Sequence, residues 1–356
     1  MLPAPFHADL AYGPKGGKAR WLKTADGRQL RLVLWPTEEA PRGTVFIFEG
    51  RSEYAEKYGP VAGWLTAGGY GVQVLDWRGQ GLSDRLLDDP AKGHIDRYSD
   101  YQADLECWLE AAGAMGAPRP WFILGHSMGA CIALRRLTGT HPFSACAFGA
   151  PMWGMGAPWY LRPFSRRLAR RLNGTARALD YMPGQGPVAY PLTIPFEGNE
   201  LTQSVKAWAN MLMVMGQCPE MTVAGATIQW AVASELETRA LARKPSPDLP
   251  CYVGLGTDER IVNPAAVHER MARWPGAELE LFEGARHELM VELPRHRIRF
   301  LDRAGKLFDR VAAEIRGGEP LPAAQTGEPA ASPPLRPRRK LRLDDWTRDP
   351  APPSTT

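Results

Sequence analysis

Hydrophobic residues along this chain form short apolar runs that alternate with longer segments of helical periodicity. Runs rich in β-branched and aromatic residues predict buried strands, and apolar positions three or four residues apart predict helices. The predicted strands are residues 44–48, 72–75, 120–124, 145–148, 251–255 and 279–282. The predicted helices are residues 58–67, 101–112, 130–137, 264–274 and 294–315. This alternation predicts an α/β fold, in which helices cover both faces of a mostly parallel sheet.

Two interruptions divide the pattern. Residues 151–249 are rich in Met, Trp and Pro and show helical segments without clear strands. Such an insertion predicts a helical cap over a core formed by residues 1–150 and 250–316. From residue 317 to 356, Pro, Ala and charged residues dominate, and such a segment cannot bury enough apolar surface to fold. We therefore expect a disordered, Pro-rich tail. At the other end, Asp26-Gly27 between two apolar runs predicts a β-hairpin.

Composition narrows the class of protein. Of 356 residues, 44% are hydrophobic and 23% charged, as in ordinary globular proteins, and a net charge of +4 is too small to indicate nucleic-acid binding. Five cysteines with no C-x-x-C pair predict reduced thiols, and Cys107, Cys131, Cys146 and Cys251 lie in apolar runs typical of a core. No secretory signal or membrane-spanning run is visible, which favours a cytoplasmic protein, at most peripheral at the inner membrane.

The pentapeptide Gly-His-Ser-Met-Gly at residues 125–129 lies between a predicted strand and a predicted helix. A strand that turns sharply into a helix strains the backbone of the central residue, and the flanking glycines let the neighbouring backbone pass. The strain projects the hydroxyl outward, so Ser127 is predicted to be a nucleophile. The alternative is an ordinary serine in a glycine-rich turn. We interpret His126, inside the pentapeptide, as a packing residue.

A serine nucleophile needs a base and an acid that orients the base, and in this fold type the order along the chain is serine, acid, histidine. Among seven histidines, His287 lies in a loop just after a late strand, where the base belongs. A solvent-exposed loop histidine is the alternative. The acid is expected after strand 251–255, where Asp258 and Glu259 are adjacent. Neighbours in an extended loop point to different sides, so only one of them can serve. These residues alone leave the choice open.

Five segments resemble the monoacylglycerol lipases and the bacterial lysophospholipases of the L2 type, within the α/β-hydrolase superfamily. They are EGRSEY at 49–54, DWRGQGLS at 76–83, the pentapeptide, GTDERIV at 256–262 and GARHE at 284–288. The resemblance covers about residues 44–315 and implies the α/β-hydrolase fold. It selects Glu259 as the acid by its spacing from Gly256 and Val262, with Asp258 as the alternative.

The tetrahedral oxyanion of an ester hydrolase needs two preorganised N–H donors. One is predicted to be the backbone N–H of Met128, at the N-terminus of the helix. The resemblance implies that the second is the backbone N–H of Arg51, in a loop whose family pattern is His-Gly-x-x-Glu. This chain has Glu49 in place of that histidine, and we expect Glu49 to pair with Arg51 or Arg78. Glu53 matches the glutamate of the loop and is implied to brace it.

The predicted cap carries residues suited to a lipid. Its methionines and tryptophans fit an adaptable groove for an acyl chain, with Met152, Trp153 and Trp159 as candidate substrate contacts, or they pack the cap against the sheet. Residues 161–177 combine six arginines with apolar residues at helical spacing. This pattern is typical of a helix that lies on an anionic membrane or of a solvated helix face.

Together these features predict a serine carboxylester hydrolase that releases a fatty acid from a lysophospholipid or monoacylglycerol through an acyl-enzyme. The alternatives are a catalytically silent scaffold that binds lipid or a protein partner, and a serine peptidase on the same scaffold. No cofactor is expected, because dinucleotide and phosphate-loop motifs are missing. No metal is expected, because Val291 stands where the zinc motif that begins at His287 needs a second histidine. The sequence gives no prediction of oligomeric state.

Overall fold

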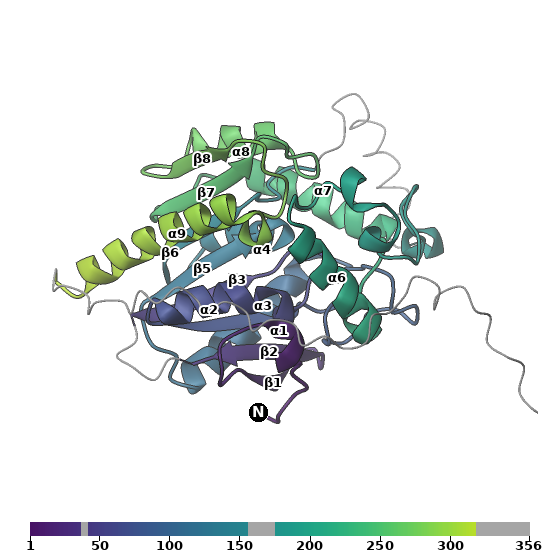
Figure 1. The fold of residues 1–356 in the computed structure, drawn as a ribbon, viewed down its shortest axis with the longest axis horizontal. Coiled ribbons are helices and arrows are strands. Elements are labelled where there is room, and N and C mark those ends of the chain that lie inside the picture. The colour runs from purple at the N-terminus through teal and green to yellow at the C-terminus, as the bar shows by residue number, and fades with distance from the viewer. Residues whose placement is uncertain (37–41, 156–174, 318–356) are drawn as a thin grey trace, which may run out of the picture. The chain divides into compact units, whose positions relative to one another are not determined.

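The computed structural model describes residues 1–36, 42–155 and 175–317, in which eight strands form one sheet. The strands are β1 (Lys18–Lys23), β2 (Gln29–Trp35), β3 (Gly43–Phe48), β4 (Tyr70–Leu75), β5 (Trp121–His126), β6 (Phe143–Gly149), β7 (Cys251–Gly256) and β8 (Glu278–Phe282). Their spatial order is β1-β2-β4-β3-β5-β6-β7-β8. The predicted hairpin forms β1 and β2, and the neighbours from β4 to β8 are parallel, which confirms the predicted mostly parallel sheet (Figure 1).

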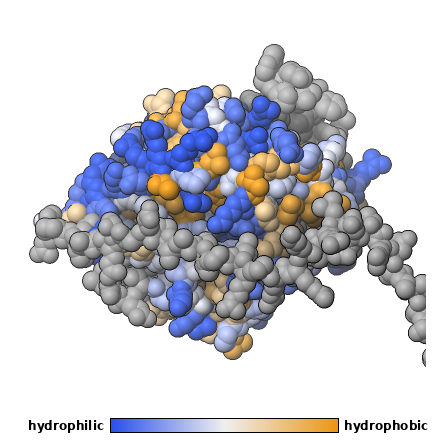
Figure 2. Space-filling model, viewed as in Figure 1, coloured by the Kyte–Doolittle hydropathy of each residue, from blue (hydrophilic) through white to orange (hydrophobic). Residues whose placement is uncertain are grey.

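Helices flank both faces of this sheet. The helices of the described residues are α1 (Ala8–Ala11), α2 (Gly59–Ala67), α3 (Tyr98–Ala114), α4 (Ser127–Leu137), α6 (Val205–Gln217), α7 (Ile228–Ala242), α8 (Pro264–Met271) and α9 (Pro294–Ile315). Short 3₁₀ turns are η1 (Ala55–Tyr58), η2 (Ala176–Leu179), η3 (Tyr190–Leu192), η4 (Phe196–Gly198), η5 (Pro219–Met221) and η6 (Leu289–Val291). Buried residues of α2 and α9 share one apolar cluster, and those of α3, α4 and α8 share another. The outward side of α9 is mostly hydrophilic, as Figure 2 shows.

The central strand β3 shows why two layers of helices are needed. Val45 and Ile47 lie in the cluster with α2 and α9, whereas Phe46 and Phe48 lie in the cluster with α3 and α4. All four side chains are fully buried. Successive side chains of a strand point to opposite faces, so a strand that is apolar throughout must be covered on both. The sheet therefore has an apolar core on each side.

Two helices begin three residues earlier than predicted. Helix α3 begins at Tyr98 rather than at residue 101, because the Asp100 carboxylate accepts the Arg97 N–H and caps the first turn. Helix α4 begins at Ser127 rather than at residue 130, directly where β5 ends. The serine is thus the first residue of the helix, and no loop residue separates it from the strand.

The described part of the segment between β6 and β7 contains α6, α7 and 3₁₀ turns, and residues 175–249 contribute no strand. Side-chain hydroxyl groups cap the N-termini of both helices: Ser204 Oγ accepts the Ala207 N–H, and Thr227 Oγ1 accepts the Trp230 N–H. The division into core and cap stays a prediction. Of the predicted tail, residues 318–356 lie outside the described residues.

Two further expectations concern the cysteines and the membrane. All five cysteines are free, and four are buried. Cys107 is only half-buried, contrary to the expectation from its apolar neighbours, because its side of α3 meets the backbone of β1, where the thiol donates to the Lys23 carbonyl. None of the described helices combines the length and the apolar character that a membrane span requires.

Candidate active site

Ser127 lies at the sharp turn from β5 into α4 and has a φ of +46°, in the left-handed region that non-glycine residues rarely adopt. A Cβ at Gly129 would lie 2.1 Å from the Phe48 carbonyl oxygen and 2.5 Å from that of Glu49. Only glycine therefore lets the first turn of α4 approach the end of β3 this closely. The turn holds Ser127 beside the loop that follows β3.

His287 and Glu259 meet where the loops after β8 and β7 converge. Their Nδ1 and Oε2 atoms are 2.7 Å apart, and both side chains are buried. The other oxygen of Glu259 accepts the N–H groups of Ile261 and Val262, at 2.7 and 3.0 Å. Asp258, the alternative acid, is exposed. The geometry thus pairs His287 with Glu259.

The histidine pair connects this dyad to the elbow. The ring of His287 lies 4.7 Å, centroid to centroid, from the ring of His126, the residue just before Ser127. His126 is buried, as expected of a packing residue, and its Nδ1 bonds to the Gly149 carbonyl at 3.0 Å. Its position against His287 was missed by the interpretation from sequence. The three residues predicted for the catalytic steps therefore follow the carboxyl ends of β5, β7 and β8, at one edge of the sheet.

Charge and burial act on this dyad in opposite directions. Burial alone would lower the pKa of His287, but the charge of Glu259 and its hydrogen bond outweigh burial and raise that pKa above its ordinary value. Burial would raise the pKa of Glu259, but His287 and the two backbone N–H groups lower it. Glu259 is therefore ionised at neutral pH and accepts a proton-bearing Nδ1. Neutral His287 then has Nε2 free as a base.

In the loop after β3, the backbone N–H of Arg51 has no hydrogen-bond acceptor among the described residues. The N–H groups on either side are both engaged. Gly50 donates to the Glu53 carboxylate, and Ser52 donates to Gln80 Oε1 at 3.2 Å. At the elbow, α4 has no side-chain cap, so its first N–H groups, which include that of Met128, are not bonded by the cap residue. The two N–H groups predicted to bind the oxyanion, those of Arg51 and Met128, therefore donate to no side chain named here.

Glu49 does not pair with Arg51 or Arg78, contrary to our expectation. Its side chain is fully buried, and Oε1 accepts from Gln80 Nε2 at 2.7 Å, while Oε2 has no partner. Burial, reinforced by the charge of Asp76, raises the pKa of Glu49 well above its usual range. Burial therefore favours the protonated, uncharged form of this carboxyl group beneath the loop.

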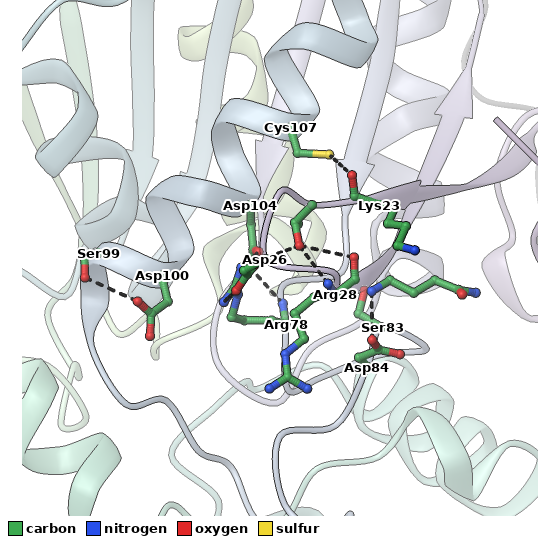
Figure 3. A network of polar contacts seen from close by, with 12 residues as sticks. Lys23, Asp26, Arg28, Arg78, Ser83, Asp84, Ser99, Asp100, Asp104 and Cys107 are labelled. Atoms are coloured by element: carbon green, nitrogen blue, oxygen red, sulfur yellow. Dashed lines mark hydrogen bonds and ion pairs between the residues drawn. The ribbon is translucent and has the colours of Figure 1, made fainter. Parts of the chain in front are cut away.

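Arg78 is engaged elsewhere, in the segment that resembles the family motif at residues 76–83. It lies between Asp104, whose Oδ1 is 2.7 Å from Arg78 Nε, and Asp26, whose Oδ2 is 2.8 Å from Nη1 (Figure 3). In the same segment, Asp76 pairs with the buried Arg31 at 2.7 Å. These contacts tie the motif to β2, α3 and the hairpin turn. The motif therefore supports the loop architecture rather than the reacting atoms.

A buried ion network that we did not foresee lies beside His126. Lys57 Nζ is 2.6 Å from Glu53 Oε1 and 2.7 Å from Glu288 Oε1, and all three side chains are nearly inaccessible. Glu53 also accepts from Gly50 N–H and from the Tyr58 hydroxyl, so it braces the loop as the resemblance implied. The signal available from sequence was Glu288, next to the candidate base.

Two groups of described residues have ligand atoms close enough together to hold a metal ion. The group of Glu53, His126 and Glu288 already receives a cation, because Lys57 bonds to both carboxylates. The group of His7, Cys218 and Glu220 lies where the N-terminal segment meets η5.

The candidate substrate contacts fall in different places. The Met152 N–H donates to the Ser127 carbonyl at 3.0 Å, so this residue adjoins the elbow. Trp153 is buried, stacks on Trp274 with ring centroids 5.8 Å apart, and donates Nε1–H to the Ala130 carbonyl. This packing places Trp153 in the core. Trp159 lies outside the described residues.

Known proteins resemble this chain over the segment that contains the candidate site. A family model described as Hydrolase_4, serine aminopeptidase S33, matches residues 39–294, which include Ser127, Glu259 and His287. The lysophospholipase L2 of Escherichia coli (strain K12) is 32% identical over 281 residues, which cover 75% of this chain and 80% of the relative. The probable lysophospholipase L2 of Haemophilus influenzae is 28% identical over 267 residues, covering 74% and 82%.

Solved structures share the fold. A soluble variant of monoglyceride lipase from Saccharomyces cerevisiae, in complex with a substrate analog, superposes with a TM-score of 0.64 at 19% identity and covers 87% of this chain and 100% of its own. The monoacylglycerol lipase of Paleococcus ferrophilus gives a TM-score of 0.62 at 18% identity and covers 78% and 98%.

Proposed function

Because this chain belongs to the serine aminopeptidase S33 family of α/β-hydrolases and is a carboxylic ester hydrolase, we propose that Ser127, His287 and Glu259 form its catalytic triad. The substrate class is the lipid esters of the lysophospholipase and monoacylglycerol lipase type. The observation that carries the assignment is the 2.7 Å contact between His287 Nδ1 and Glu259 Oε2, with the His287 ring packed against His126, which directly precedes the strained serine.

In the first half of the reaction, Ser127 Oγ attacks the ester carbonyl carbon while Nε2 of His287 takes the hydroxyl proton. Glu259 holds the proton on Nδ1, which fixes the tautomer and stabilises the imidazolium that forms. The oxyanion receives the N–H groups of Met128 and Arg51. Collapse of the tetrahedral species transfers the proton from His287 to the leaving glycerol oxygen and leaves an acyl-serine.

In the second half, water replaces the alcohol. His287 takes a proton from the water as it attacks the acyl carbonyl, and the same two N–H donors bind the second oxyanion. Return of the proton to Ser127 Oγ releases the fatty acid. The raised pKa of His287 sets the lower end of the active pH range, because only the neutral ring accepts the proton.

Fatty-acid release tests this proposal. The Ser127→Ala variant should release oleate from 1-oleoyl lysophosphatidylcholine and 1-oleoylglycerol more slowly than the parent by about 10⁴-fold or more. Ser99→Ala, at an exposed position in the first turn of α3, is the matched control and should retain activity. Full turnover by Ser127→Ala would contradict the assignment.

We also propose peripheral contact with anionic membrane. Apolar side chains between β6 and β7 stay exposed, among them Val188 at 51%, Leu192 at 55% and Val205 at 64%. The basic run predicted to contact lipid falls mostly outside the described residues, at 156–174. Co-sedimentation with phosphatidylglycerol vesicles, but not with phosphatidylcholine vesicles, is expected for the full chain. Equal recovery in the supernatant with both would contradict the proposal.

A further inference from the structure

The side chain of Arg51, in the loop after β3, carries a charge that no carboxylate of the described residues neutralises. Its Cζ lies 5.3 Å from the centroid of the Trp230 ring, and Nη1 donates to the Ala224 carbonyl at 2.9 Å. Nε and Nη2 have no acceptor among the described residues, and the residue as a whole is half-buried. The guanidinium thus offers N–H groups to a ligand.

Three buried arginines of the described residues show how the half-buried Arg51 differs. Arg31 bonds to Glu56 and Asp76, and Arg78 bonds to Asp26 and Asp104. Arg270 lacks a carboxylate but donates to three oxygens, those of Leu241, Lys244 and Ser246. The side chain of Arg51 donates to one.

Within residues 1–36, 42–155 and 175–317, no acid compensates the charge of Arg51. The titratable side chains that interact with it are Tyr98 and Tyr101, and burial raises the pKa of both hydroxyls, so they are neutral. Burial without a counter-charge lowers the pKa of Arg51. Residues 156–174, which the structure does not describe, contain no Asp or Glu. A half-buried cation on an aromatic ring, whose remaining N–H groups meet no acceptor and no acid in the described part of the chain, is suited to an anionic ligand.

The covalent geometry of the substrate matches this position. If the Arg51 backbone N–H binds the oxyanion, the ester carbon lies next to the backbone of that residue. In a 1-acyl lysophospholipid, the number of bonds from the ester carbon to phosphorus equals the number from the Arg51 backbone nitrogen to Cζ. A phosphate group can therefore reach the guanidinium while the carbonyl is held by the backbone. Guanidinium groups bind phosphate oxygens through two parallel N–H donors.

We infer that the Arg51 guanidinium binds the phosphate of a lysophospholipid headgroup while the backbone N–H of the same residue binds the oxyanion. The inference rests on the proposed function, because the position of the ester carbon comes from it. It makes Arg51 a specificity-determining residue that favours phosphate-bearing monoacyl lipids over neutral monoacylglycerols.

Binding of unreactive ether lipids tests the inference without depending on turnover. Calorimetry compares 1-O-alkyl lysophosphatidylglycerol with 1-O-alkylglycerol, which differ in the phosphate headgroup and have no ester. In Arg51→Gln, the affinity ratio of the phospholipid to the neutral lipid should fall by about 10- to 100-fold, and in Arg51→Lys by less, because lysine keeps the charge without the fork. Arg119→Gln is the matched control: this exposed arginine also stacks on a tryptophan, Trp121 at 4.0 Å, but at the opposite end of β5.

The outcomes separate the two proposals. An unchanged affinity ratio in Arg51→Gln would overturn the inference. Arg51 would then serve only to connect its loop to the backbone of residue 224 through a hydrogen bond. Inorganic phosphate that competes as well as the ether phospholipid would assign the site to free phosphate and also overturn it. Failure of the parent to hydrolyse 1-oleoyl lysophosphatidylglycerol, with the binding ratio still dependent on Arg51, would refute the proposed function alone.

Discussion

Replacing Glu259 by Gln removes a charge from a site where both carboxylate oxygens are used. Oε2 accepts from His287 Nδ1 at 2.7 Å, and Oε1 accepts from two backbone N–H groups. A glutamine has only one acceptor oxygen. If that oxygen faces the backbone donors, the amide NH₂ faces His287 and favours the tautomer with its proton on Nε2. If it faces His287, the NH₂ meets two backbone donors.

The magnitude follows from these two costs. A base in the wrong tautomer cannot accept the Ser127 proton, and loss of the carboxylate also removes the charge that stabilises the imidazolium. We expect kcat to fall by about 10³- to 10⁴-fold, which corresponds to about 4–5.5 kcal/mol of transition-state stabilisation. In the parent, activity should fall as the pH drops through the raised pKa of His287. Without the Glu259 charge that pKa decreases, so the acid limb of kcat/KM should move to lower pH.

Steady-state hydrolysis of p-nitrophenyl butyrate across a pH series measures both effects. Asp258→Asn is the matched control, because Asp258 is adjacent in sequence but exposed. It should keep the rate and the pH profile of the parent. A Glu259→Gln enzyme within tenfold of the parent at every pH, or a large loss in Asp258→Asn, would refute the reasoning.

Three further predictions concern stability, each measured by urea denaturation. The pKa of Glu49 is raised in the folded protein above its value of about 4.3 in the unfolded chain, so the parent should lose stability as the pH rises between these two pKa values. Glu49→Gln should lose less stability than the parent between about pH 5 and pH 8, and an equal loss would contradict the raised pKa. Gly129→Ala should lower the free energy of unfolding by about 3 kcal/mol or more, because its Cβ would lie 2.1 Å from the Phe48 carbonyl oxygen. Gly139→Ala is the control and should change stability little, because its Cβ would lie 3.7 Å from the Arg136 carbonyl oxygen; equal costs would contradict the packing argument. Lys57→Met should cost about 3–5 kcal/mol, since it leaves two buried carboxylates without their cation, and a neutral effect would contradict the role of the network.

Local sequence signals were sufficient wherever periodicity or turn chemistry dictates structure. Helix α9 begins and ends as predicted, because its apolar positions recur strictly and Pro294 starts it. Strand β5 and the turn at Ser127 follow from an apolar run next to two glycines. The choice between Asp258 and Glu259 required the structure, because it depends on how the loop after β7 turns relative to His287.

Contacts between distant segments were beyond the sequence. Lys57 and Glu288 are 231 residues apart, and nothing local to either indicates their ion pair. The partner of Glu49 was also beyond local signals: we expected an ion pair with Arg51 or Arg78. Folding instead places Gln80 against its carboxyl group and buries it, which raises its pKa and favours the uncharged form. Burial is a property of the assembled fold, and a residue's neighbours in the chain do not reveal it.

Covalent labelling tests the central claim, that Ser127 is the activated nucleophile, most directly. The folded protein of residues 1–356 is treated with a fluorophosphonate probe and digested, and the labelled peptides are mapped by mass spectrometry. We predict a single phosphonylated serine, Ser127, with labelling slowed strongly in His287→Ala because the proton acceptor is lost. Labelling of another serine, or no labelling of Ser127 in folded protein, would contradict the account.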